Sequence, residues 1–180
     1  MVNDVFVEQI VRRKNTPQRM LAKAGIVIGA VVVALALVFF SGLLGEFAMF
    51  GTMAAIGALY GGYYLLTGMN VEYEYIVTNG EMDVDSIIAQ RKRKRLLTVS
   101  FRDAEAFGRY NAQEHEGKTY GTRLFACDSP DSQNLWYVTA RVKDKGQVLL
   151  VFNGFDRVLE AIKPFLPRPL FHQAFNRVQG

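Results

Sequence analysis

The sequence predicts an α+β protein in which a two-helix transmembrane hairpin is followed by an antiparallel β-meander and one C-terminal helix. Three observations lead to this class: two long runs without an ionisable side chain, alternating apolar and polar residues after residue 70, and one apolar stripe of helical period near the C-terminus. They divide the chain into a basic amphipathic N-terminal segment (1–23), the hairpin (24–69), a β-domain with its helix (70–170) and a tail (171–180).

The hairpin is predicted from two apolar runs, Ala24–Leu44 of about 21 residues and Phe47–Met69 of about 23, separated by little more than Glu46. About 20 apolar residues span the hydrocarbon core of a bilayer. The first run is too long for the apolar core of a cleaved signal peptide, and no small-residue cleavage pattern follows it. A buried hairpin of a soluble protein is the alternative, but such helices normally carry polar residues at the 3.6 period.

The flanking charges predict on which side of the membrane the chain ends lie. Cations cluster ahead of the first run, at Arg12, Arg13, Lys14, Arg19 and Lys23, whereas the turn at 42–46 has none. Because Lys and Arg near span ends favour the cytoplasmic side, both termini are expected in the cytoplasm. A re-entrant hairpin that never crosses the membrane is the weaker alternative, since neither run is too short to span.

Small residues within the two runs predict close helix packing. Small residues stand four apart on a helix face: Gly25 and Gly29 in the first run, and Gly57 and Gly61 with Ala54, Ala58 and Gly62 in the second. Such spacing lets helix backbones approach closely in lipid, either within the hairpin or between two copies of a homo-oligomer, and the sequence leaves both open. The absence of Asp, Glu, Lys, Arg and His from both runs argues against a transporter, channel or proton relay.

A short amphipathic helix is expected ahead of the hairpin. Asn3 or Asp4 would cap it, and its apolar face and basic end would be formed by Phe6, Val7, Ile10 and Val11 and by Arg12, Arg13 and Lys14. Pro17 suits the first turn of the next helix. The short helix would lie along the inner leaflet or pack against the soluble domain.

The β-domain is predicted from a change to period-two alternation. Val71, Tyr73, Tyr75 and Val77 alternate with acids, and Asn79–Gly80 suits a tight hairpin turn. Further strands are expected at Met82–Gln90, Leu96–Phe101, Lys118–Cys127, Leu135–Lys143 and Gln147–Phe152. A helix then begins at Asp156, with one apolar stripe that ends near Pro164 and Pro167.

This order of elements, roughly from Val71 to Leu166, resembles the pleckstrin-homology-like (PH-like) domains of bacterial membrane proteins. The resemblance implies two bent sheets in a partly open barrel, with the helix closing one end. Phosphoinositide-binding members carry basic residues about the first hairpin, whereas this chain has Asn79 and Gly80 there and places its cations after the second strand. We therefore do not transfer a lipid headgroup site from that superfamily.

Two stretches are similar to a more specific family. "NVEYEYIVTNGEMDVDSIIAQRKRKRLLTV" and "LEAIKPFLPR" resemble small two-span proteins of anaerobic Gram-positive bacteria that are known as a domain of unknown function. This resemblance covers most of the chain. It implies a multi-pass protein of the bacterial cytoplasmic membrane, and it implies no established activity.

A block of like charge follows the second strand. We expect the cations of this block, together with three cations of the N-terminal segment, to contact anionic lipid headgroups. The residues are Arg91, Lys92, Arg93, Lys94 and Arg95 in the block, and Arg12, Arg13 and Lys14 in the N-terminal segment. A solvated loop that only completes the cytoplasmic charge pattern is the alternative. Nucleic acid is disfavoured as a partner, because the net charge of +4 is modest.

Catalysis has little support, and no catalytic, cofactor-binding or metal-binding residue is predicted. Cys127 ends an alternating strand and is expected in the core, whereas His115 and His172 lack ligand spacing and are expected to face solvent. Asp83 and Asp85 share a strand face, and charge pairing with the basic block explains them better than a metal site. Seven aromatic residues are expected to fill a small barrel: Phe101, Phe107, Tyr110, Tyr120, Phe125, Trp136 and Tyr137.

The predicted function is that of a non-enzymatic, membrane-anchored binding or scaffold module. Its partner would be a protein or the anionic inner leaflet, and a protein is favoured because PH-like domains serve chiefly as interaction scaffolds. The alternative is an enzyme, or an accessory subunit of an enzyme, that acts on a membrane substrate. A deep polar pocket in the β-domain would favour that alternative, whereas a filled barrel would favour binding.

Overall fold

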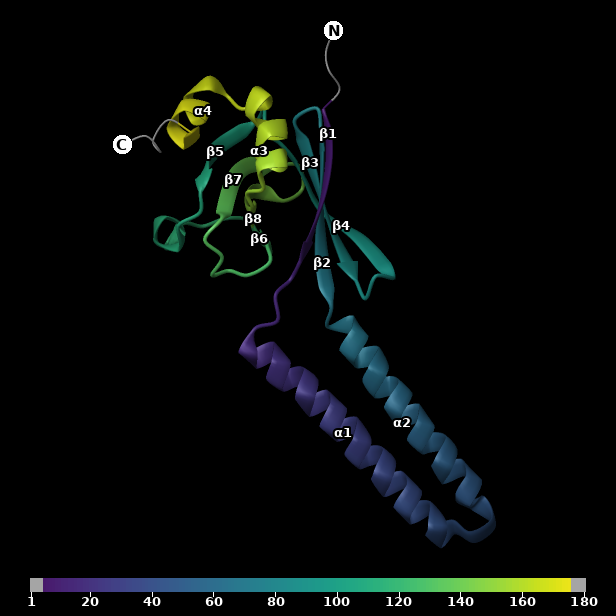
Figure 1. The fold of residues 1–180 in the computed structure, drawn as a ribbon. Helices are drawn as coiled ribbons and strands as arrows, with labels where there is room; N and C mark the ends of the chain where they lie inside the picture. Colours follow the sequence, from purple (N-terminus) through teal and green to yellow (C-terminus); the bar gives the residue numbers. More distant parts are fainter. Residues whose placement is uncertain (1–4, 176–180) are drawn as a thin grey trace. The chain divides into compact units, whose positions relative to one another are not determined.

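The computed structural model describes residues 5–175, apart from the side chain of residue 44. The described residues form two compact units: one holds residues 5–13, 72–87 and 92–175, and the other holds residues 14–71 and 88–91. Figure 1 shows the helices and strands of both. The α+β class is confirmed. The proposed helix caps Asn3 and Asp4 and the last residues of the tail, 176–180, lie outside the described residues.

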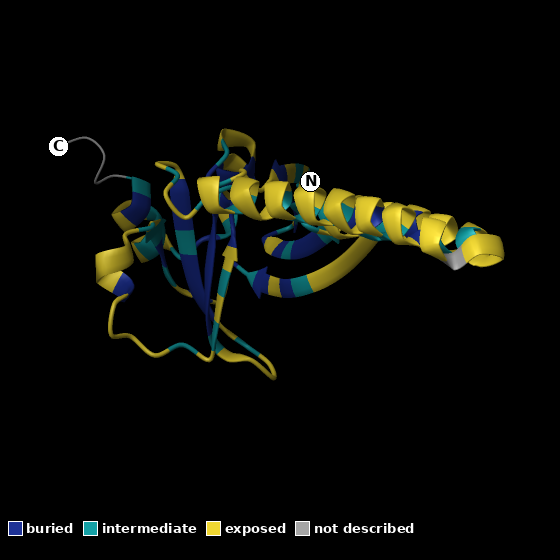
Figure 2. Ribbon diagram, turned by 90° about the horizontal axis from the view of Figure 1, so that it is seen from below, coloured by how far each residue is buried: buried dark blue, intermediate teal, exposed yellow. Residues whose placement is uncertain are grey.

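The second unit is an antiparallel pair of helices. α1 (Pro17–Ser41) begins at the predicted proline, a six-residue 3-10 segment η1 (Gly42–Phe47) turns the chain, and α2 (Ala48–Gly68) returns. Both helices are long and apolar enough to cross a membrane, and only 11% of each span window is buried. Figure 2 shows the hairpin almost wholly in the colour of exposed residues. A helix in the core of a soluble protein would be mostly buried instead.

The first four-stranded sheet begins ahead of the hairpin. Its order is β1 (Phe6–Arg12), β2 (Val71–Thr78), β3 (Glu81–Ile88) and β4 (Lys92–Ser100). β1 pairs with β2 along its whole length, from Phe6 opposite Thr78 to Arg12 opposite Glu72. The prediction of a helix at this place is therefore wrong. The spacing of the apolar residues fits the period of a helix and also that of a strand, and pairing with β2 selects the strand.

This pairing makes the helical hairpin an insertion between two adjacent strands. Only residues 13–16 separate β1 from α1, and only Met69 and Asn70 separate α2 from β2. The end of the sheet also holds β1 through Asn79, whose side-chain oxygen accepts a hydrogen bond from the Val5 amide at 3.1 Å. The N-terminal strand and the residues after the hairpin thus belong to one folding unit.

The predicted turn between β2 and β3 is confirmed. Asn79 and Gly80 have φ values of 49° and 89°, which a type I′ turn requires at both central positions. A Cβ atom at Gly80 would lie 2.5 Å from Cγ of Phe165, so the position needs glycine for space as well as for its backbone angle. Because Gly80 has no side chain, the ring of Phe165 packs directly against the backbone of the turn.

The second sheet has the order β5 (Ala104–Arg109), β7 (Leu135–Val142), β8 (Gly146–Asn153) and β6 (Thr122–Ala126). The last three strands in this list were predicted, whereas β5 was not. β6 runs parallel to β8, so the meander is not antiparallel throughout. The chain passes from β6 to β7 at one end of the sheet, and β7, which is antiparallel to β8, carries it back so that β8 can run parallel to β6.

Helices complete the first unit. The predicted helix is confirmed as α3 (Asp156–Ile162), whose Val158 and Ile162 are wholly buried. A 3-10 turn η3 (Lys163–Phe165) follows at the predicted prolines, and α4 (Arg168–Phe175) then adds a second short helix. Phe175 of α4 stacks on Trp136 with ring centroids 5.3 Å apart. The aromatic layer thus extends beyond the sheets.

The two sheets enclose a filled core. Tyr75, Phe101 and Phe152 are fully buried, and the rings of Phe101 and Tyr75 each meet Phe152 edge-on. The Tyr75 hydroxyl donates a hydrogen bond to the carbonyl of Ala126 and accepts one from the amide of Asn153 at 3.2 Å. Tyr75 therefore ties β2 of one sheet to β6 and β8 of the other through two buried backbone groups.

Candidate functional site

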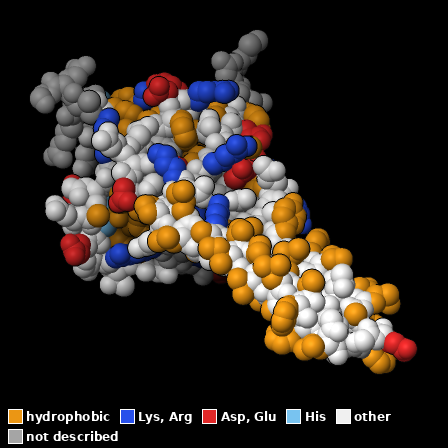
Figure 3. All heavy atoms as spheres, turned by 60° about the horizontal axis from the view of Figure 1, so that its bottom comes forward, with side chains coloured by type: hydrophobic (Ala, Val, Ile, Leu, Met, Phe, Trp, Pro, Cys, Tyr) orange, Lys and Arg blue, Asp and Glu red, His pale blue; other side chains and the backbone are white. Residues whose placement is uncertain are grey.

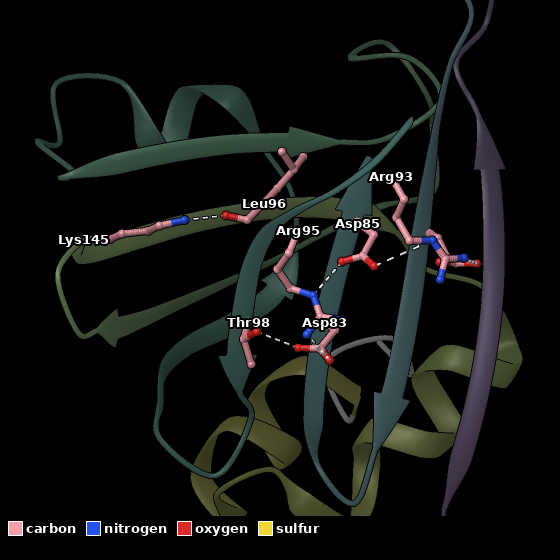
Figure 4. A network of polar contacts seen from close by, with 8 residues as sticks. Asp83, Asp85, Arg93, Arg95, Leu96, Thr98 and Lys145 are labelled. Atoms are coloured by element: carbon pink, nitrogen blue, oxygen red, sulfur yellow. Dashed lines mark hydrogen bonds and ion pairs between the residues drawn. The ribbon is translucent and has the colours of Figure 1, made fainter. Parts of the chain in front are cut away.

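The basic block lies mostly inside β4, where Arg95 is held by two acids of β3. Its Nε is 2.6 Å from Oδ1 of Asp85, and its Nη1 is 2.7 Å from Oδ2 of Asp83 (Figure 4). Thr98 also donates to Asp83, at 2.6 Å. The hydrogen bond to Asp85 raises the pKa of Arg95. The prediction that Asp83 and Asp85 pair with the basic block is confirmed.

Arg93 is held by a buried acid that the sequence did not single out. Glu74 on β2 is 1% exposed, and Nη2 of Arg93 lies 2.6 Å from its Oε1 and 2.5 Å from its Oε2. Burial raises the pKa of Glu74, as does a hydrogen bond with Glu8 on β1, whereas Arg93 lowers it. Arg93 thus offsets part of the cost of burying this carboxyl group.

The other three cations of the block have no such role. Arg91, Lys92 and Lys94 are exposed, and within residues 5–175 they make no ion pair. The block is therefore divided: two arginines neutralise acids of the same sheet, and three cations stay available to an outside anion. The lipid contact expected for all five stays a prediction.

The N-terminal cations also differ from one another. Nε of Arg12 is 3.0 Å from Oε1 of Glu72, directly across the β1–β2 pair. Because the Arg12 side chain is 78% exposed, this pair contributes about 0–1 kcal/mol. Arg13 and Lys14 are exposed in the connection to α1. Their expected contact with headgroups stays a prediction.

The turn that leads into the block has an unusual backbone. Ala89 and Gln90 have φ values of 54° and 56°, a region in which residues other than glycine cost about 1–3 kcal/mol each. The Ala89 amide donates to the carbonyl of Asn70 at 2.9 Å, and the Arg91 amide donates to the carbonyl of Ile88 at 3.1 Å. The first bond holds the turn beside Asn70, two residues after α2, and the second closes the turn itself.

Close packing within the hairpin depends on two glycines: Gly62, which is among the small residues noted in the second run, and Gly51, which was not predicted. A Cβ atom at Gly51 would lie 2.4 Å from Cβ of Ser41, and one at Gly62 would lie 2.6 Å from Cβ of Ala30. At the four predicted glycines, an added Cβ would meet no atom within 4 Å: Gly25, Gly29, Gly57 and Gly61. A contact between copies through those four stays a prediction. Figure 3 shows hydrophobic side chains along the visible face of the hairpin.

His115 is buried, with 3% of its surface exposed, so the prediction that it faces solvent is wrong. Its Nδ1 is 2.8 Å from the Tyr120 hydroxyl, and its ring stacks on Tyr110 and meets Tyr137 edge-on at 4.3 Å. Burial lowers the pKa of His115, and the charge of Lys118 lowers it further. The neutral ring therefore packs as an aromatic group against the tyrosines of the second sheet.

The remaining candidates for chemistry behave as structural residues. Cys127 is 3% exposed and packs with Leu135, Leu149 and Val151, as predicted for a core side chain. Burial raises the pKa of its thiol to about 11, so the thiol is neutral at physiological pH. His172 is exposed, as predicted. Among the described residues 5–175, no group of three or more His, Cys, Asp or Glu side chains is placed to hold a metal ion.

Two four-stranded sheets around a filled core, closed by a helix, define a PH-like domain, here with a helical hairpin between its first two strands. The chain belongs to the family described as "Bacterial PH-like domain (DUF6106)", whose model matches residues 3–172. The matched range includes both candidate membrane spans. The resemblance to a bacterial PH-like family of unknown function is thus confirmed. Neither the curated proteins nor the solved structures include a match.

Proposed function

We propose that the chain is a membrane-anchored binding module whose PH-like domain contacts the anionic leaflet of the bacterial cytoplasmic membrane. The hairpin would be the anchor, since its two helices are long, apolar and exposed. Cations precede the first helix and Glu46 stands in the turn, so both termini would lie in the cytoplasm.

The observation that carries this proposal is the division of the basic block. Arg93 and Arg95 are occupied by acids of their own sheet, whereas Arg91, Lys92 and Lys94 are exposed without an ion pair in the described chain. A basic side chain near an anionic leaflet contributes about 1 kcal/mol, so three contribute about 3 kcal/mol. This is weak for a free protein. For a tethered domain it is enough to favour one orientation, because the anchor holds the domain near the surface.

The filled core supports binding in preference to catalysis. Tyr75, Phe101 and Phe152 occupy the space between the sheets, where a substrate pocket would need room. A domain with such a core interacts through its surface. A protein partner would then bind the part of the surface that the membrane leaves free; β6, an edge strand with the partly exposed Phe125, offers a place for strand addition.

Lysine labelling of the full chain in nanodiscs tests the leaflet contact. In nanodiscs that contain phosphatidylglycerol, we expect acetylation of Lys92 and Lys94 to be several-fold slower than in phosphatidylcholine, because bound headgroups shield their amines. High salt should remove the difference. Lys118 and Lys143, which are exposed on the same domain, serve as comparison lysines. Equal rates for Lys92 and Lys94 in both lipids would contradict the contact.

A further inference from the structure

Lys23 joins the two ends of the helical hairpin. Its Nζ donates to Oδ1 of Asn15 at 2.8 Å and to Oδ1 of Asn70 at 2.9 Å. Asn15 precedes α1, and Asn70 follows α2. An ammonium group has three hydrogens to donate. Within the described chain, one donor of Lys23 is left over, at a fixed position at the base of the hairpin.

Two further cations gather at the same base. Arg19 stands one helical turn before Lys23 on α1, so the two side chains share a helix face. Arg91 follows the strained Ala89–Gln90 turn, which the bond from the Ala89 amide fixes to the carbonyl of Asn70. The side chain of Asn70 therefore accepts a hydrogen bond from Lys23, and its backbone carbonyl accepts one from the turn that precedes Arg91.

This positive charge has no counterpart within its unit. Glu46 is the only acidic residue among residues 14–71 and 88–91, and it lies in η1, at the opposite end of the hairpin. Among residues 5–175, Arg19, Lys23 and Arg91 make no ion pair. The turn fixed to Asn70 thus places Arg91 at the same end of the hairpin as Arg19 and Lys23, while the only acid of this unit lies at the other end. This excess of positive charge indicates an anion as the missing partner.

The position along the helices indicates which anion. Lys23 stands just before the uncharged run that begins at Ala24, and Asn70 stands just after the second run ends. In a spanning hairpin these residues lie where the hydrocarbon meets the headgroups, the depth at which phospholipid phosphates are found. Guanidinium groups bind phosphate through paired hydrogen bonds, and an ammonium group adds a point charge.

We propose that Arg19, Lys23 and Arg91 bind the phosphate of one anionic phospholipid at the base of the hairpin. The proposal rests on the membrane anchoring proposed above. It adds a single bound lipid to the diffuse contact of Lys92 and Lys94. The two asparagines position Lys23, and the three cations hold the phosphate.

Native mass spectrometry of the full chain in mild detergent tests the site, with added phosphatidylglycerol, phosphatidylcholine or inorganic phosphate as probes. We expect one retained phosphatidylglycerol, bound at least tenfold more tightly than phosphatidylcholine. Arg19→Gln with Arg91→Gln should weaken it about 25-fold, or about fivefold for each cation. Both substitutions leave the Lys23 contacts in place. Lys118→Gln with Lys143→Gln is the matched control, and it should leave retention unchanged.

Three results would overturn the site: equal retention of the two lipids, unchanged retention in the Arg19/Arg91 variant, or displacement of the lipid by inorganic phosphate, which would indicate a site for a free anion. The labelling of Lys92 and Lys94 separates this site from the proposed function. If labelling depends on phosphatidylglycerol but retention does not, the single-lipid site is wrong and the leaflet contact stands.

Discussion

A chain in which residues 13–71 are replaced by a short turn containing Asn-Gly is expected to fold as a soluble PH-like domain. β1 and β2 are already antiparallel neighbours, and Arg12 lies directly opposite Glu72. A tight turn can therefore join the strands without changing their register. The replacement removes nearly all of the exposed apolar surface that the hairpin carries. Gel filtration and dispersed amide NMR signals should show a folded monomer.

The contrasting variant is residues 70–180 alone, which keeps the predicted β-domain and all of α4 but lacks β1. We expect it to aggregate or to remain unfolded. It loses the buried Val11 and the whole β1–β2 ladder, and β2 becomes an unprotected edge strand. Equal folding of the two variants, judged by the same measurements, would show that β1 is not part of the domain.

Tyr75→Phe is expected to lower the free energy of unfolding by about 2–4 kcal/mol, although it removes a single oxygen atom. The Ala126 carbonyl and the Asn153 amide both lose their bond to the Tyr75 hydroxyl inside the core. A buried polar group that is left unpaired costs about 1–3 kcal/mol. The loss should appear as a lower urea midpoint in the hairpin-replaced chain.

Tyr73→Phe is the matched control for this substitution. Tyr73 lies on the same strand and is 8% exposed. Within the described residues its hydroxyl makes no hydrogen bond, so we expect the substitution to leave no buried group unpaired and to change the free energy of unfolding by less than about 0.5 kcal/mol. Similar losses for both variants would mean that the hydroxyl of Tyr75 does not link the sheets.

The sequence predicted the elements whose signals are local. The two long apolar helices, the Asn79–Gly80 turn and the helix at Asp156 depend on composition and on neighbouring residues, and each is present. β1 depends on a partner that follows the whole hairpin, and its short apolar pattern also fits a helix. β5 was missed because its six residues include Gly108 and show little alternation.

The candidate site was predictable only in part. Asp83 and Asp85 could be paired with the basic block because alternation places them on one strand face near it. Glu74 looked like an exposed acid, and only the neighbouring strands show that it is buried. The hydrogen bond from Lys23 to Asn70 joins the two ends of the hairpin, which are far apart in the sequence, so no local pattern indicates it. Glycine spacing alone does not show which helix face meets the partner helix, so it favoured the four paired glycines over Gly62 and missed Gly51.

Cysteine accessibility in intact cells tests the anchoring most directly. Cys127 is the only native cysteine and is buried, so the background reaction should be low. With a membrane-impermeant maleimide, we predict that Glu46→Cys in the hairpin turn reacts from outside. Lys143→Cys in the β-domain should react only after lysis. Reaction of Lys143→Cys in intact cells, or of neither variant before lysis, would contradict a membrane-spanning hairpin with its domain in the cytoplasm.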